Sequence, residues 1–340
     1  MKYKNFKNLL CCLISVMLVS CELPSRQSLG ESKPAILRTI SADQSIPNEE
    51  YVMVTTAINM PMYVNHDQAA FKRWGEQRGV KVSILGPAEW DVPLQIETIE
   101  QVIATRPTGL LINGTDPGIA QAINRAVDAG IPTVVYDSDI PNSKRHAFLG
   151  TDWYQIGLMQ GEEMARLIGG KGKVAYMGIL GLTNMEQGFQ GMLDVFKKYP
   201  DIEVVGRYDD KANVETAARI TSDLLAAHPD LAGICGFDSN SGPGIALAVK
   251  EAGKVGVVKI TTVDWEPEHL QLVKEGVIQM LAGQKRALFT WYGAQFLYDM
   301  VHNTNRLSYN DAETGITNVP STVNTGLLRI TKENVDQFYY

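Results

Sequence analysis

From about residue 51 onward, short runs of β-branched and apolar residues alternate with amphipathic stretches. Phe71 and Trp74 share the apolar face of a first predicted helix, and a second helix is expected to begin at Asp91, with Pro93 in its first turn. Because helix-length crossovers separate the strands, the pattern predicts a parallel sheet covered on both faces. The strands of this first half are predicted at residues 51–58, 81–85, 109–113 and 132–136.

The same pattern restarts after Gly150. A long helical stretch runs to Gly169, and strands are expected at residues 173–178, 202–206, 231–237 and 257–263. The two halves share the order of their strands and helices, but their amino-acid sequences are only weakly similar. The sequence therefore predicts an α/β fold made of two lobes, each a doubly wound parallel sheet.

Polar residues cluster where several predicted strands end. Asp116, Asp137, Asp238 and Asp264 each follow a strand closely, and residues 136–139 (YDSD) resemble residues 237–240 (FDSN). In open parallel sheets, ligands bind beyond the carboxyl ends of the strands. An Asp at such a place can instead cap the next helix. We favour capping for Asp116 and a ligand site for the other three.

The first twenty residues form a separate segment. Lys2, Lys4 and Lys7 precede an apolar run at residues 9–19, which has the length of a secretory leader. Residues 18–21 (LVSC) resemble the lipobox of bacterial lipoproteins, in which the cysteine carries the lipid. We therefore expect a signal peptide at residues 1–20, a lipid anchor on Cys21 and a tether at residues 21–50. The alternative is a plain secretory leader followed by a chance cysteine.

Composition narrows the class of protein further. The chain has 340 residues, of which 45% are hydrophobic and 20% charged, and its net charge is −7. These values are ordinary for a folded globular protein. Removing the three leader lysines would change the charge to −10 (−7 − 3), which argues against nucleic acid as a partner. After that cleavage only Cys21 and Cys235 remain, and we expect Cys235 to be a small buried side chain.

Sequence motifs for catalysis are missing. No glycine-rich dinucleotide fingerprint follows the first strand, and the chain has no Walker A sequence, no Gly-x-Ser-x-Gly elbow and no paired histidines of a zinc motif. Nothing pairs a nucleophile with a base. We therefore expect a protein that is not an enzyme and that has no cofactor or metal.

Five segments, in order along the chain, resemble a known family. The family is the type I periplasmic binding proteins of sugar ABC transporters, in particular the ribose-, galactose- and xylose-binding group. The resemblance implies two lobes joined by a three-strand hinge, at residues 51–151 plus 285–320 and residues 152–284 plus 321–340. The segments that carry it are residues 56–63, 109–117, 130–157, 235–253 and 261–276.

The resemblance also implies a binding site between the lobes. It places polar and aromatic contacts in the turn after the first strand, a ligand carboxylate in each lobe and a glutamine at the hinge. We add two tryptophans next to these segments as candidates for stacking on a sugar ring. The residues concerned are Asn59, Tyr63, Trp90, Asn113, Asp137, Asp238, Asp264, Trp265 and Gln284.

Two positions depart from the family pattern. Ser138 stands where ribose binders carry Arg, and residues 184–192 lack the Arg usual there, with Asn184 and Gln187 as polar substitutes. Because Arg is the usual reader of carboxylate and phosphate groups, its loss favours an uncharged ligand. We therefore expect a neutral monosaccharide or polyol.

The resemblance implies a role in transport. The protein would bind its sugar outside the cytoplasm as a monomer, attached to a membrane only through Cys21, and deliver it to a permease and its ATPase. A sensing subunit for a membrane kinase or chemoreceptor remains an alternative, and a glycan-processing enzyme is a more distant one. A lac-type regulator shares the fold, but residues 1–50 read as a leader and tether rather than as a DNA-binding helix-turn-helix.

Overall fold

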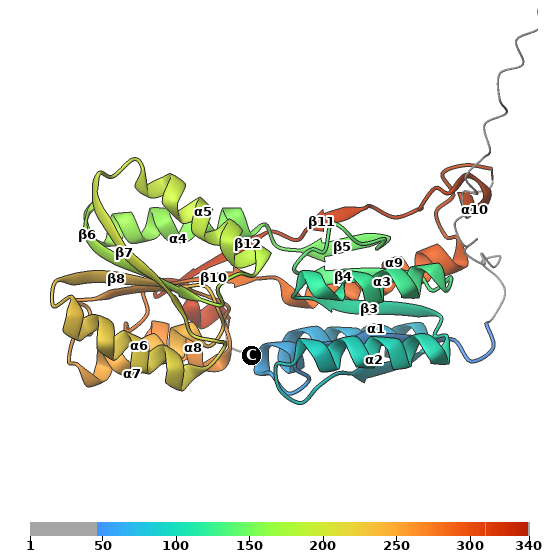
Figure 1. Cartoon of the computed structure of the whole chain (residues 1–340), viewed down its shortest axis with the longest axis horizontal. Coiled ribbons are helices and arrows are strands. Elements are labelled where there is room, and N and C mark those ends of the chain that lie inside the picture. Colours follow the sequence, from blue (N-terminus) through green and yellow to red (C-terminus); the bar gives the residue numbers. More distant parts are fainter. Residues whose placement is uncertain (1–45, 310, 339–340) are drawn as a thin grey trace, which may run out of the picture. The chain divides into compact units, whose positions relative to one another are not determined.

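The computed structural model describes residues 46–309 and 311–338, which form two six-stranded sheets flanked by helices (Figure 1). The predicted leader, Cys21 and residues 21–45 of the tether lie outside the described residues. The described part is thus an α/β structure with two sheets, as the sequence predicts.

The first sheet, called the N-terminal sheet, has the strand order β11-β5-β4-β3-β1-β2, and every pair in it is parallel. Its face with Tyr51 and Met53 is covered by α1 and α9, and the opposite face by α2 and α3. Its elements are β1 (Glu50–Val54), α1 (Ala69–Arg78), β2 (Lys81–Leu85), α2 (Val92–Thr105), β3 (Gly109–Gly114), α3 (Ala120–Asp128), β4 (Thr133–Asp137), β5 (Ala147–Gly150), α9 (Arg286–His302), α10 (Asp311–Thr314) and β11 (Thr322–Asn324).

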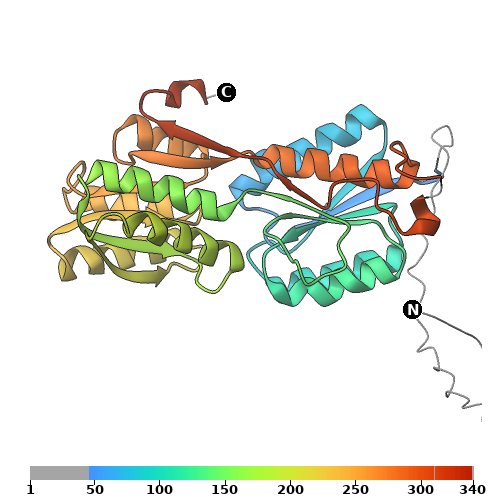
Figure 2. The same cartoon turned by 90° about the horizontal axis from the view of Figure 1, so that it is seen from above.

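The second sheet, called the C-terminal sheet, has the order β12-β10-β9-β8-β6-β7, and only β12 runs antiparallel to its neighbour. Helices α4 and α5 cover one face, and α6, α7 and α8 cover the other (Figure 2). Its elements are α4 (Trp153–Leu167), β6 (Lys171–Gly178), α5 (Thr183–Phe196), β7 (Asp201–Asp209), α6 (Val214–Ala227), β8 (Leu231–Gly236), α7 (Ser241–Glu251), β9 (Lys259–Val263), α8 (Pro267–Lys274), β10 (Met280–Gln284) and β12 (Leu327–Thr331).

Local signals in the sequence account for several boundaries. Asp91 caps α2 as predicted, because its carboxylate accepts a hydrogen bond from the backbone N–H of Leu94. Trp74, predicted on the apolar face of the first helix, is buried in the core. The strand predicted at residues 51–58 is too long, since β1 ends at Val54 and a short π-helical turn follows at Tyr63–Gln68.

The chain passes between the sheets three times. It does so after β5, between β10 and α9, and between β11 and β12. We expected the last return to the C-terminal lobe at residue 321, but Thr322–Asn324 still pair with Phe148–Gly150 of the N-terminal sheet. This three-residue strand forms hydrogen bonds with the edge of β5 that does not face β4. It is too short for its sequence to show the alternation of apolar and polar residues that predicts a strand.

Candidate ligand-binding site

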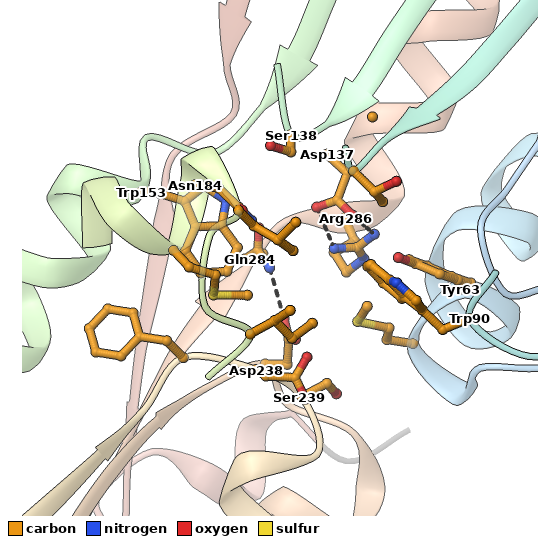
Figure 3. A pocket seen from close by; sticks show the side chains of 18 residues that line it. Tyr63, Trp90, Asp137, Ser138, Trp153, Asn184, Asp238, Ser239, Gln284 and Arg286 are labelled. Atoms are coloured by element: carbon orange, nitrogen blue, oxygen red, sulfur yellow. Dashed lines mark hydrogen bonds and ion pairs between the residues drawn. The ribbon is translucent and has the colours of Figure 1, made fainter. Parts of the chain in front are cut away.

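A cavity lies where the carboxyl ends of strands from both sheets come together (Figure 3). It contains about 380 Å³ of space not filled by protein atoms, part of which is open to solvent. The residues that line it are Met62, Tyr63, Trp90, Gly114, Thr115, Asp137, Ser138, Trp153, Ile179, Leu182, Asn184, Met185, Phe237, Asp238, Ser239, Asp264, Gln284 and Arg286.

On the side of the cavity formed by the N-terminal sheet, Asp137 is the last residue of β4 and accepts hydrogen bonds from two side chains. Arg286 donates to both of its oxygens, Nη1 to Oδ1 at 2.9 Å and Nη2 to Oδ2 at 3.1 Å, and Asn113 Nδ2 donates to Oδ2 at 3.0 Å. A Cβ on Gly114 would collide with the carbonyl oxygen of Ser138, so glycine lets β3 and the residue after β4 approach closely. The carboxylate is therefore fixed in place beside the cavity.

Arg286 was missed by the sequence analysis, which expected a site without arginine. It opens α9 directly after the crossover from β10 and is almost fully buried, with its guanidinium 5.1 Å from the centre of the Tyr63 ring. Besides Asp137 it contacts Asp67, through Nε at 3.1 Å and Nη2 at 2.7 Å. A cation in the first turn of a helix opposes the helix dipole, and that mismatch was the available signal of a nearby anion.

Asp264 and Asp238 approach the cavity from the C-terminal side. Gln284, the last residue of β10, donates from Nε2 to Oδ1 of Asp264 at 3.0 Å. Asp238 follows β8 and accepts from the backbone N–H of Asn240, while Asp210 behind it accepts from the Ser241 hydroxyl. Carboxylates from both sheets thus face one space.

Burial dominates the acidity of these carboxyl groups. It raises the pKa of Asp264 to about 6, with Arg286 and Gln284 acting in the opposite direction, and it raises the pKa of Asp67 to about 7 against the pull of Arg286. Burial also raises the pKa of Asp238, to which the nearby Asp210 carboxyl adds. The C-terminal side can therefore both accept and, where a carboxyl holds a proton, donate hydrogen bonds.

Aromatic side chains and unpartnered polar atoms complete the wall. Tyr63 and Trp90 line the cavity as predicted candidates, and Trp153 lines it as well. Three buried atoms here have no hydrogen-bond partner within the protein: Trp153 Nε1, Asn184 Oδ1 and Gln284 Oε1. Buried polar atoms are normally paired, so these are available to a ligand.

Four predicted site residues do not line this cavity. Asn59 is exposed in the turn after β1, and Asn113 lies buried beneath Asp137 rather than at the surface of the cavity. Gln187 lines a neighbouring cavity that also includes Ser138 and Asn184. Trp265 donates from Nε1 to the Gln284 carbonyl, packs against His66 and Phe338, and lines two other cavities.

Eight of the predicted residues do come together at the cavity. They are Tyr63, Trp90, Asp137, Ser138, Asn184, Asp238, Asp264 and Gln284. Asp116, for which capping was favoured, accepts from the backbone N–H of Gly118.

Across residues 46–309 and 311–338, no three or more His, Cys, Asp or Glu side chains are grouped so as to hold a metal ion. Within the described part of the chain, no helix is both long and apolar enough to cross a bilayer.

Comparison with known proteins places this geometry in a family. A family model described as periplasmic binding protein domain matches residues 51–305. The D-ribose/D-allose-binding protein of Pseudomonas aeruginosa is 26% identical over 215 residues, which cover 61% of this chain and 67% of that protein. The D-allose-binding periplasmic protein of Escherichia coli is 24% identical over 261 residues, covering 74% and 84%.

Several solved structures resemble this chain in fold, and the matches cover nearly their whole length. AraP, an arabinose-binding protein from Geobacillus stearothermophilus, is 34% identical with a TM-score of 0.74, and the match covers 86% of this chain and 100% of AraP. A sugar-binding protein of a sugar ABC transporter from Bacillus halodurans is 32% identical with a TM-score of 0.77 and the same coverage. These relatives are binding proteins rather than enzymes. The chain therefore belongs to the periplasmic binding protein family and has its type I fold.

Proposed function

We propose that this protein binds an uncharged monosaccharide or polyol between its two lobes and delivers it to an ABC transporter, without chemical change to the ligand. One observation carries the proposal: Asp137 from the N-terminal sheet and Asp238 and Asp264 from the C-terminal sheet line the same cavity. A ligand held by all three needs both lobes, so it favours the closed arrangement.

The side chains suit a polyhydroxylated ligand. A carboxylate accepts from two adjacent hydroxyl groups, and a hydrogen bond to a charged group contributes about 1.5–3 kcal/mol. Tyr63, Trp90 and Trp153 offer flat apolar surfaces for the C–H face of a sugar ring. After the entropic costs of ordering the ligand and the side chains, a few such contacts suffice for a Kd of about 1 μM.

The relatives support this class of ligand and a transport role. Two solved relatives above 30% identity are named as an arabinose-binding protein and as a sugar-binding protein of an ABC transporter. The second of these names favours a transport component over a sensing subunit. We further propose a permease and an ATPase as partners.

The family is extracytoplasmic, and we propose that this protein is attached to a membrane there. The support is the basic and apolar leader followed by residues 18–21 (LVSC). Lipidation of Cys21 would hold the two lobes beside the permease through the tether.

A thermal-shift screen followed by calorimetry tests the proposed function. The panel contains D- and L-arabinose, ribose, allose, xylitol and galactose. A ligand at 100 times its Kd stabilises the protein by about 2.7 kcal/mol, which raises the Tm by several degrees. We expect at least one neutral sugar or polyol to do this with a Kd in the micromolar range or below. If none raises the Tm and calorimetry detects no heat of binding, the proposed function is wrong.

A further inference from the structure

Asp67 is a buried carboxylate that lies behind the cavity wall. Its side chain is 0% exposed and is not among the residues that line the cavity, whereas Arg286 is. The Arg286 guanidinium stands between Asp67 and Asp137 and gives two hydrogen bonds to each. Asp67 therefore reaches the cavity only through Arg286.

These contacts occupy most of the hydrogen-bond donors of the Arg286 guanidinium. Arg286 has five N–H donors, and four of them are directed at the two carboxylates. The backbone carbonyl of Asp67 accepts from the Thr290 hydroxyl at 2.7 Å, one helical turn after Arg286. Both the carboxylate and the backbone of Asp67 are thus fastened to the start of α9.

The charge at this wall follows from the same geometry. When both carboxylates are ionised, the unit of Asp67, Arg286 and Asp137 carries a net charge of −1. Arg286 is the only Lys or Arg among the described residues that line the cavity, and Asp238 and Asp264 face it from the other sheet. An unpaired arginine here would attract an anionic ligand, but Arg286 is already paired with two carboxylates.

We propose that Asp67 is a specificity-determining residue: by holding Arg286 it keeps the cavity wall negative, so the protein selects uncharged sugars over sugar phosphates and other anionic sugars. This inference rests on the proposed function. It concerns a residue that does not touch the ligand and acts on it through the Arg286 guanidinium.

The test compares a neutral sugar with its phosphate in the full chain and in Asp67→Asn. The probes are D-arabinose, ribose and allose with arabinose 5-phosphate, ribose 5-phosphate and allose 6-phosphate, titrated by calorimetry at pH 8, above the pKa of about 7 to which burial raises the Asp67 carboxyl. Asn has the shape of Asp but no charge, so the unit becomes neutral. We expect the preference for the neutral sugar to fall at least about tenfold, chiefly because the phosphate binds more tightly.

Two further variants separate specificity from general damage to the fold. Glu163→Gln removes a mostly buried carboxylate that pairs with Arg166 and Arg329 away from the cavity, and it should leave the preference unchanged. Asp67→Glu keeps the charge and should restore the preference lost in Asp67→Asn. A purely structural role for Asp67 would weaken both ligands alike and leave their ratio constant.

The outcomes distinguish the two proposals. If no neutral sugar of the wider panel binds, the proposed function fails and this inference fails with it. If neutral sugars bind but Asp67→Asn keeps the wild-type ratio, only this inference is wrong. The wild-type protein alone also tests it, because equal affinity for a sugar and its phosphate would contradict a negative wall whether or not the variants fold.

Discussion

Asp137 and Asp264 occupy corresponding positions in the two sheets, and both have a left-handed backbone, with φ of +80° and +65°. Asp137 is the last residue of the buried strand β4, Asp264 comes directly after the buried strand β9, and both line the shared cavity. A non-glycine residue with positive φ is uncommon and costs about 1–3 kcal/mol, which proteins tolerate mainly at functional sites. The two sheets thus present a carboxylate in the same backbone conformation at matching strand ends.

The first prediction concerns these two carboxylates. Asp137→Ala and Asp264→Ala should each abolish sugar binding measurable at micromolar Kd, because each removes hydrogen bonds worth about 1.5–3 kcal/mol apiece. Calorimetry with the best sugar of the panel measures the loss, and circular dichroism checks the fold.

Asp116→Ala is the matched control for these variants. Asp116 also follows a strand, but it only caps the next turn and lies outside the cavity. It should cost about 1 kcal/mol of stability and leave the affinity unchanged. Unchanged affinity in both cavity variants would remove the support for this site.

The second prediction concerns stability. Arg286→Ala leaves Asp67 and Asp137 buried without their cation, and it should lower the free energy of unfolding by about 3–5 kcal/mol. Urea denaturation measures this. Arg219→Ala, which breaks an exposed pair with Asp223, should cost no more than about 1 kcal/mol. Similar small losses in both variants would mean that the buried pair is not required for the fold.

The third prediction concerns pH. Burial raises the pKa of Asp264 to about 6, above the value near 4 of an unfolded chain, so the folded protein binds this proton more tightly. The contribution of Asp264 to stability is therefore greatest below about pH 4 and is lost as the pH rises to about 6 and beyond.

Asp264→Asn isolates this effect, because every other titrating group is present in both proteins. The free energy of unfolding of the wild type, relative to Asp264→Asn, should fall by roughly 2–3 kcal/mol between pH 4 and pH 7. Urea denaturation across that range measures the difference. A difference that stays constant, or that grows in favour of the wild type as the pH rises, would show that the Asp264 carboxyl is not destabilised by burial.

The fourth prediction concerns the anchor. In a bacterial host that processes lipoproteins, the wild-type chain should fractionate with membranes, and Cys21→Ala should release it because the proposed lipid is attached through Cys21. Cys235→Ala is the control, since Cys235 is buried in the C-terminal sheet and should not affect partitioning. Mass spectrometry of the mature N-terminus identifies the lipid. Membrane association that persists in Cys21→Ala would exclude this anchor.

The strands and the carboxylates could be predicted because both are local features. An Asp directly after a buried run, as at Asp137 and Asp264, is visible in the sequence and takes its meaning from the rule that ligands bind at the ends of parallel strands. The helix cap at Asp91 is readable for the same reason, since its partner is only three residues away.

The Asp67–Arg286 pair could not be found in this way. The two residues are 219 positions apart and meet only when α9 packs beside the π-helical turn after β1. Hydrophobic periodicity describes which face of a helix is buried, not which distant side chain lies opposite it. The positions of Asn59 and Trp265 outside the cavity could not be foreseen for a similar reason, because being next to a site segment in sequence does not fix where a side chain lies in space.

The most direct test of the account is a crystal structure with the best-binding sugar of the panel. We predict that the sugar occupies the cavity, with hydroxyl groups within hydrogen-bond distance of Asp137 on the side of the N-terminal sheet and of Asp238 or Asp264 on the side of the C-terminal sheet. A sugar bound elsewhere, or one that contacts only a single lobe, would contradict it.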